Sequence, residues 1–174
     1  MGCQSTESSD VEQIQDAFSA WQKAQTASPD GEFVATENCN LEYVVNTEGS
    51  AMLGFPEDIN FHYADVNGDD KSDALITFFP VQCDGGNAAM WMQYQLLVLS
   101  QKGSDYSIDE IPLHPNALSL LNGPYFLDSL SDQHAFGRYF EFVQGDARCC
   151  PSVNKTLTID MSSFKVTLAD LQEE

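Results

Sequence analysis

Residues 59–81 read INFHYADVNGDDKSDALITFFPV, and this stretch decides the fold because two different apolar patterns flank one acidic turn. Before the turn, the apolar residues Ile59, Phe61 and Tyr63 fall at every second position, which is typical of a strand with one buried face. After the turn, residues 74–81 are apolar on both faces, which predicts a central strand. The short acidic connection favours antiparallel pairing of the two strands.

Further segments with strand-like patterns follow at short intervals. They are Leu41–Asn46, Ala89–Ser100, Tyr106–Ile111, Gly137–Val143, and the pair 157–161 and 164–168 with a turn at Ser162–Ser163. Leu113–Gln133 is ambiguous, because it contains Pro115, Asn122-Gly123-Pro124 and a run over 117–121 that suits a short helix. Strands joined by short turns predict a mainly antiparallel sheet.

Asp10–Gln25 is predicted to form a helix. Its apolar residues recur at helical spacing: Val11, Ile14, Phe18 and Trp21. Ser9 and Glu12 form a capping-box signature, which places the start of the helix at Ser9. We therefore predict an α+β fold in which this helix covers a mainly antiparallel sheet, with a single globular domain over residues 10–174 and a flexible tether over residues 1–9. A β-sandwich or a small barrel that carries a helix is the alternative.

The composition excludes several classes of protein. The 174 residues include 27 acidic and 7 basic side chains, a formal net charge of −20, and 43 % of the residues are hydrophobic. The apolar content is too high for a disordered chain, and no apolar run approaches the roughly 20 residues that cross a bilayer. The negative charge would repel nucleic acid. Three explanations of this charge remain open: adaptation to a saline environment outside the cell, simple solubility, and affinity for a cationic partner.

The N-terminus Met1-Gly2-Cys3 has two lipidation interpretations. Gly2 followed by Thr6 fits a myristoylation pattern, with Cys3 available for a palmitoyl group. Alternatively, Gly2-Cys3 resembles the end of the lipobox of bacterial lipoproteins, in which Cys3 would carry the lipid and residues 4–9 would act as a tether. We favour the lipoprotein interpretation, because myristoylation would place a net charge of −20 beside an anionic cytosolic leaflet. A third interpretation is that Cys3 is incidental.

The four cysteines beyond Cys3 are an even number, which is typical of an oxidising compartment: Cys39, Cys83, Cys149 and Cys150. A bond between the adjacent Cys149 and Cys150 would require a strained ring. We therefore expect two disulfides that join the regions of Cys39 and Cys83 to the segment 146–151. A redox-active or metal-binding cysteine pair is the alternative.

The acidic turn carries the clearest chemical signal in the chain. Oxygen-bearing side chains stand at relative positions 1, 3, 5 and 9, and the backbone carbonyl of position 7 is a further donor: Asp65, Asn67, Asp69, Asp73 and Lys71. Ca²⁺ takes six or more oxygen ligands, and alternate residues of a tight loop can supply them. Gly68 lets the chain turn sharply. The two interpretations left open are a calcium site and an acidic turn without metal.

This loop resembles the D-x-[DN]-G-D-x-x-x-D calcium loops of dockerins and FG-GAP repeats. The resemblance covers nine residues of 174, so it implies a metal loop and not a family fold. Position 6, usually Gly, is Asp70, which can adopt the left-handed conformation at some cost. Position 12, where an EF-hand has its bidentate Glu, is Ile76, so a further ligand must come from elsewhere or from water.

Other groups of chemically active residues give weaker signals, and no catalytic residue is assigned. His62, His114 and His134 lie far apart in the sequence. The segment around His134 contains two aspartates and two serines, Asp128, Asp132, Ser129 and Ser131. It does not contain the G-x-S-x-G motif that holds the nucleophile of many hydrolases. An aromatic binding face is a further hypothesis, although aromatic residues in strands are usually core: Trp91, Tyr94, Tyr125 and Tyr139.

Together these patterns predict an exported, lipid-anchored protein of the bacterial cell envelope, in the periplasm or on the cell surface. It would act as a binding or structural module for an unidentified protein or glycan partner, with calcium as a candidate stabilising ion. One alternative is an extracellular hydrolase whose catalytic carboxylates lie among the 16 Asp and 11 Glu. The other is a capture or inhibitor domain for a basic partner.

Overall fold

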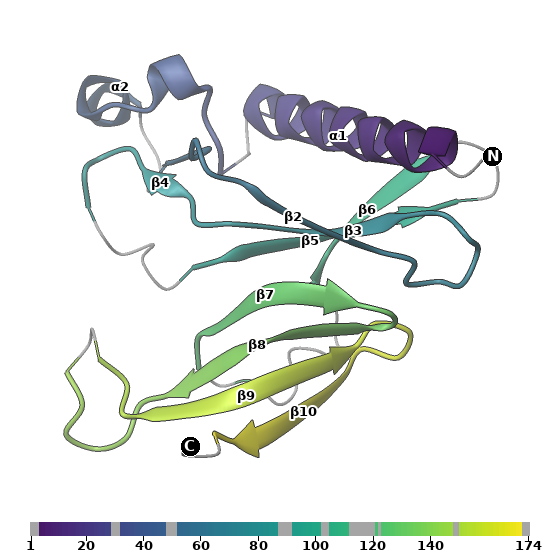
Figure 1. The fold of residues 1–174 in the computed structure, drawn as a ribbon. Helices are drawn as coiled ribbons and strands as arrows, with labels where there is room; N and C mark the ends of the chain where they lie inside the picture. Colours follow the sequence, from purple (N-terminus) through teal and green to yellow (C-terminus); the bar gives the residue numbers. More distant parts are fainter. Residues whose placement is uncertain are drawn as a thin grey trace.

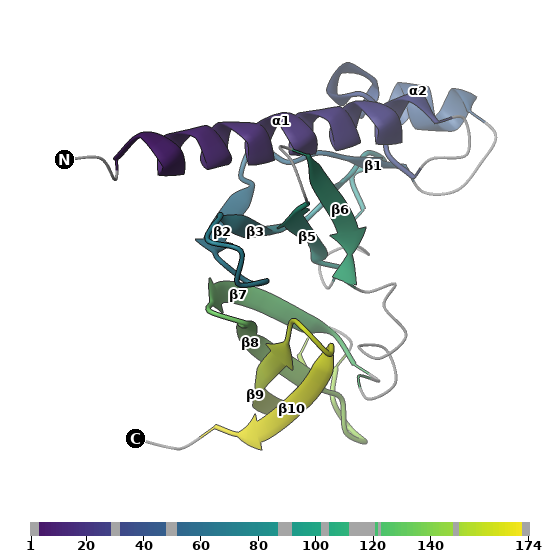
Figure 2. The ribbon, with the colours of Figure 1, turned by 90° about the vertical axis from the view of Figure 1, so that its right-hand side faces the viewer.

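The computed structural model describes residues 4–28, 32–47, 52–86, 92–101, 105–111, 121, 123–147 and 150–171. It has three layers, in which one long helix lies over a four-stranded antiparallel sheet and a second four-stranded antiparallel sheet lies beneath (Figure 1). The view at 90° shows the same order, with the helix and the second sheet on opposite sides of the first (Figure 2). The predicted α+β fold, with an N-terminal helix over antiparallel sheets, is confirmed.

The upper two layers are formed by the first two thirds of the chain. The helix is α1, Gln4–Ala27. The first sheet has the order β2-β3-β5-β6, and its strands are β2 (Asn60–Ala64), β3 (Asp73–Phe78), β5 (Tyr94–Ser100) and β6 (Tyr106–Glu110).

The lower layer is a meander, in which each strand pairs with the next one along the chain. Its strands are β7 (Tyr125–Ser131), β8 (His134–Glu141), β9 (Val153–Asp160) and β10 (Lys165–Asp170). The predicted pairing of Leu157 with Leu168 and of Ile159 with Val166 is confirmed in the β9–β10 hairpin.

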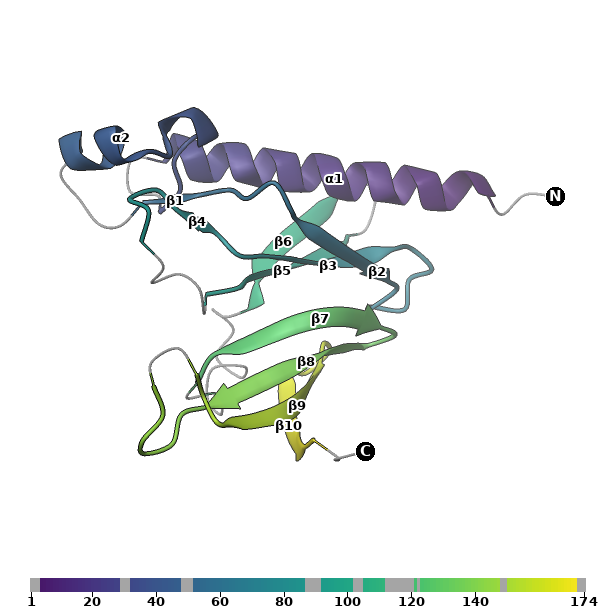
Figure 3. The same cartoon turned by 60° about the vertical axis from the view of Figure 1, so that its left-hand side comes forward.

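A small substructure lies beside the end of α1. It consists of the 3-10 helix η1 (Thr36–Asn38), α2 (Leu41–Asn46), and the paired short strands β1 (Leu53–Gly54) and β4 (Val81–Gln82). Figure 3 shows α2 above this strand pair, at the C-terminal end of α1. No helix of the described residues is long and apolar enough to cross a membrane.

Strand β3 is buried on both faces, as the sequence predicted for a central strand. Ala74, Ile76 and Phe78 face α1, where they pack with Ile14 and Phe18 of the helix. The fully buried Phe78 contacts a ring of aromatic side chains: Phe18, Trp21, Phe33, Phe55 and Tyr94. This aromatic cluster explains how a single helix can cover the sheet, since large rings bury much apolar area per residue.

The opposite face of the first sheet packs on the second sheet. Leu75 and Leu97 contribute from above, and Leu127, Leu157 and Ile159 contribute from below. Both cores share β3 and β5, whose residues alternate between the two faces.

A glutamine also links the two sheets. The side chain of Gln93 accepts a hydrogen bond from the backbone N–H of Leu127 at 2.7 Å and donates one to the Leu127 carbonyl at 3.0 Å. The register of β7 and β8 shifts between Leu127 and Ser129. At the irregular point of β7, the side-chain amide of Gln93 therefore forms the two hydrogen bonds to Leu127 that the backbone of a neighbouring strand would otherwise form.

The prediction that Leu41–Asn46 is a strand was wrong, because this segment is helix α2. Asn40 caps the helix, with its side-chain oxygen accepting a hydrogen bond from the backbone N–H of Tyr43 at 3.0 Å. The helix has no buried residue. The apolar residues at every second position, Leu41, Tyr43 and Val45, therefore do not mark the buried face of a strand.

Two other boundaries differ from the predictions. Helix α1 begins at Gln4, so residues 4–9 continue the helix and the backbone at Ser9 is already helical. The Ser9 hydroxyl accepts a hydrogen bond from the Gln13 side chain instead of capping. Strand β7 lies in the segment left ambiguous. Its buried residues Leu127 and Leu130 are three positions apart because of the register shift, which breaks the period of two.

We predict that Phe78→Ala costs about 3–5 kcal/mol of unfolding free energy, because it leaves a cavity within the aromatic cluster. Phe79→Ala is the matched control, since the two residues are adjacent but are 1 % and 42 % exposed respectively. Urea unfolding would measure both changes. Equal losses in the two variants would contradict the placement of Phe78 in the core.

Candidate functional site

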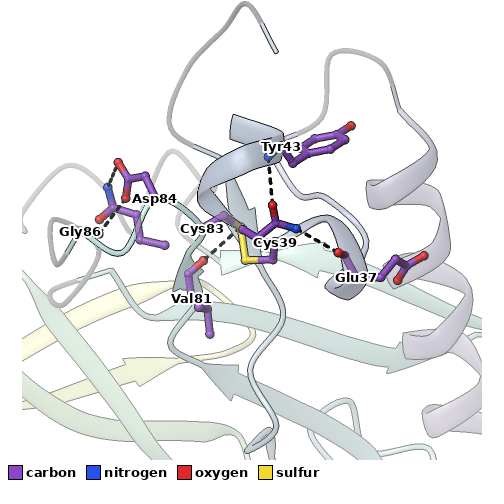
Figure 4. Close-up of a disulfide and its surroundings, with 9 residues drawn as sticks. Glu37, Cys39, Tyr43, Val81, Cys83, Asp84 and Gly86 are labelled. Carbon is purple, nitrogen blue, oxygen red and sulfur yellow. Dashed lines mark hydrogen bonds between the residues drawn. A yellow bond between two sulfur atoms is a disulfide. The ribbon is translucent and has the colours of Figure 1, made fainter. Parts of the chain in front are cut away.

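A disulfide bond joins Cys39, which precedes α2, to Cys83, which follows β4 (Figure 4). The two Cα atoms are 4.6 Å apart, within the range that disulfides require. Gly54 of β1 lies directly against the bond, because a Cβ atom at this position would stand 2.5 Å from the Cys39 sulfur. A side chain at position 54 would therefore displace the disulfide.

The expected connection of Cys39 and Cys83 to the segment 146–151 was wrong, because these two cysteines bond to each other. The pairing of β1 with β4 brings them together, and this pairing has no signal in the sequence. Cys150 is also disulfide-bonded. Cys3 and Cys149 lie outside the described residues.

The acidic turn connects β2 to β3 at one end of the first sheet. Two of its residues have positive φ angles, Gly68 at 76° and Asp70 at 65°. Gly68 turns the chain as expected, and Asp70 adopts the left-handed conformation that the sequence analysis allowed for an aspartate. Aspartate tolerates this conformation better than most residues.

The loop side chains fold back onto the loop backbone. The Asp65 carboxylate accepts hydrogen bonds from the N–H groups of Gly68 at 2.7 Å, Asp69 at 3.2 Å and Asp70 at 3.0 Å. The Asn67 oxygen accepts one from Asp69, and a carboxylate oxygen of Asp69 accepts one from Lys71. These bonds satisfy the N–H groups of a turn that has few ladder partners.

Asp73 is fully buried at the start of β3. One carboxylate oxygen accepts hydrogen bonds from the N–H groups of Val66 at 2.8 Å and Asn67 at 3.2 Å, and the other accepts one from Ser100 at 2.7 Å. Burial raises the pKa of Asp73, and these hydrogen bonds oppose the rise. Asp73 thus joins the loop to the end of β5.

Three further groups connect the loop to its surroundings. The Ser100 hydroxyl donates to Asp69 at 2.7 Å and accepts from the Asn67 amide at 2.9 Å. Asp10 of α1 accepts a hydrogen bond from the N–H of Ser72 at 3.3 Å. Burial, together with the charges of Asp10, Asp73 and Asp69, raises the pKa of Tyr106 to about 12. The loop therefore lies in a field of several carboxylates.

The predicted calcium ligands fit a cation unequally. Asp73 does not suit direct ligation, because it is buried and three N–H groups already bind its two oxygens. Asp65, Asn67 and Asp69 keep unused lone pairs, since a carboxylate offers about four acceptor positions and an amide oxygen two. Among the described residues, no group of three His, Cys, Asp or Glu side chains is arranged to hold a metal.

Two further carboxylates, Glu32 and Glu110, lie near Tyr94 and were not predicted from the sequence. The Tyr94 hydroxyl donates a hydrogen bond to Glu32, and burial and this bond raise the pKa of Tyr94. Burial, and to a lesser extent the charge of Glu32, raises the pKa of Glu110. Glu32 and Glu110 are far apart in the chain, and only the packing around the first sheet brings them close.

The remaining candidates lie apart from one another. His62 faces the second sheet, where burial lowers its pKa and the charge of Asp128 raises it. Asp128 pairs with Arg138 at 4.0 Å on the surface. Tyr139 is buried in the lower core, as expected for an aromatic residue in a strand. Trp91 and His114 lie outside the described residues.

The fold and the site together define an α+β protein with three layers, a disulfide at one end of its first sheet and an acidic turn at the other. Comparison with protein-family models, with curated proteins and with solved structures finds no match for this chain.

We predict that Asp73→Asn lowers the unfolding free energy by about 1–3 kcal/mol, because the new NH₂ group would face a backbone N–H that loses its acceptor. Asp70→Asn is the matched control: Asp70 is exposed, and asparagine also tolerates its left-handed backbone. The control should change stability by no more than about 0.5 kcal/mol. Equal unfolding midpoints in denaturant for Asp73→Asn and the unmodified protein would contradict the assigned role.

Proposed function

We propose that this chain is an exported protein of the bacterial cell envelope that acts as a binding or structural module, held at the membrane by a lipid on Cys3. The Cys39–Cys83 disulfide is the observation that carries the proposal. Disulfides persist in oxidising compartments and are rare in the cytosol. The close fit of Gly54 against the sulfur of Cys39 supports a structural bond, since the backbone leaves room for the disulfide and for no side chain.

The distribution of charge also supports a location outside the cytoplasm. Residues 1–111 carry 19 acidic and three basic side chains, whereas residues 112–174 carry eight and four. The negative charge is thus concentrated in residues 1–111, the part of the chain that contains the helix and the first sheet. Such a surface stays hydrated in a saline exterior, where ions screen the repulsion within about 8 Å.

The proposed compartment predicts that Cys39 and Cys83 resist labelling by a maleimide in native protein from a bacterial envelope fraction. Labelling should occur only after reduction, and mass spectrometry of peptides would detect it. Labelling of both thiols without reduction would contradict the proposal.

The lipid anchor is tested on the same preparation. With a bacterial lipoprotein signal peptide in front of Cys3, the protein should sediment with membranes, and Cys3→Ser should release it to the soluble fraction. Ser5→Ala is the control and should leave the protein with the membranes. An unmodified Cys3 in the mass spectrum of the membrane-bound protein would contradict the anchor.

Calcium at the acidic turn is a separate part of the proposal. Asp65, Asn67 and Asp69 would supply side-chain oxygens and Lys71 its carbonyl, while Asp73 would act as the buried anchor of the loop. Calcium would neutralise carboxylates that lie close together. Calcium at about 100 times its dissociation constant would add about 2.7 kcal/mol of stability.

The expected result is a lower melting temperature in EGTA than in calcium, with the difference lost in Asp69→Asn and kept in Asp70→Asn. Differential scanning calorimetry would measure the six combinations of three proteins and two conditions, with magnesium as a control for ionic strength. Identical melting curves in EGTA and calcium, with no metal found by elemental analysis, would rule out this part and leave the proposed compartment intact.

A further inference from the structure

The segment Thr36–Thr47, which we name the strap, is attached to the protein in an unusual way. Neither η1 nor α2, which make up most of it, has a buried residue. The strap is bonded to β4 through the Cys39–Cys83 disulfide (Figure 4). Its packing comes from half-buried side chains such as Tyr43 and Val44, and the covalent bond holds it next to the end of β4.

Two apolar residues of the strap are exposed, whereas Tyr43 and Val44 are half-buried. Leu41 is 60 % exposed and Val45 is 73 % exposed. Because they are four residues apart in helix α2, they lie on the same side of it. Val81 of β4, the strand to which the strap is bonded, is also exposed. A surface helix normally turns such residues towards the core, so this outward pair is available for a partner.

The charged side chains within the strap and next to Cys83, among the described residues, are acidic. Glu37 and Glu42 of the strap and Asp84 beside Cys83 are exposed. All three lie on or next to the two segments that the disulfide joins. A partner that covers Leu41 and Val45 would therefore meet carboxylates at the rim, and its own charge must be positive to be attracted.

We propose that the strap is a docking surface for a cationic amphipathic helix of a partner protein. Apolar side chains of that helix would cover Leu41 and Val45, and its Lys or Arg residues would meet the acidic rim. The inference rests on the proposed function as a binding module and names the chemistry of its partner. The disulfide fixes the surface in advance, which lowers the entropy lost on binding.

Two other occupants fit the charges less well. A second copy would bring the same acidic rim against this one, and like charges in an interface oppose association. A bilayer with anionic lipids would repel the surface in the same way. Both remain outcomes of the test below.

The probe is a synthetic 14-residue helix of lysine and leucine with all leucines on one face, titrated into the folded chain by calorimetry. Leu41→Ser combined with Val45→Ser should weaken binding about tenfold or more, because the apolar contacts are lost while the acidic rim remains. Val143→Ser combined with Leu171→Ser is the matched control, since both residues are 45 % exposed and distant in the chain. The control should bind as the unmodified protein does.

Several results would overturn the proposal. One is equal binding by the strap variant and the control, and another is equal binding of a scrambled peptide that has the same composition but no apolar face. Each would mean that charge alone attracts the probe. Absence of probe binding, a dimer that the strap variant abolishes, or binding to phosphatidylcholine vesicles through Leu41 and Val45 would also overturn it.

The two proposals can fail separately. The calorimetry uses purified oxidised protein and does not depend on the compartment, whereas the maleimide labelling does. Melting curves must show that both double variants keep the fold, which their exposed positions favour. Failure of the strap variant to lose affinity, with the Cys39–Cys83 bond intact, would remove the docking surface and leave the exported module standing.

Discussion

Both cores of the protein depend on the burial of β3 on its two faces. Ile14 and Phe18 of the helix pack on one face of this strand. Side chains of the second sheet, such as Leu127, pack on the opposite face. If either layer were removed, half of the side chains of β3 would face water. The layers must therefore form together, which is typical of a domain built around a shared central strand.

The sequence predicts the elements whose pattern comes from their own burial. Alternation identified β2 and the β9–β10 hairpin, and continuous apolar character identified β3. The alternation pattern failed at α2, where apolar residues occupy every second position but Leu41 and Val45 are exposed. It also failed at β7, where a register shift supported by the Gln93 side chain breaks the alternation. In both cases distant contacts or the lack of them decided the structure.

In the acidic turn too, local features could be predicted from the sequence and contacts with distant residues could not. The positive φ angles at Gly68 and Asp70 follow from local chemistry and were predictable. The role of Asp73 was not, because its partners include the backbone N–H of Ser100, which lies on another strand and carries no residue-specific signature. A carboxylate bound by three N–H groups is partly compensated without any cation. A bound cation is therefore less necessary to offset the negative charge of the turn than the spacing of its aspartates suggests.

The placement of charge explains how an apolar strap can stay exposed. The two ion pairs between described side chains, Arg138–Asp128 and Lys155–Glu141, both lie in the second sheet. In the first sheet, backbone N–H donors bind the buried carboxylate of Asp73 in place of a cation. The net negative charge of this part of the chain would oppose association between copies. The same charge would attract the cationic partner that we propose for Leu41 and Val45, so one charge pattern would disfavour a second copy and favour that partner.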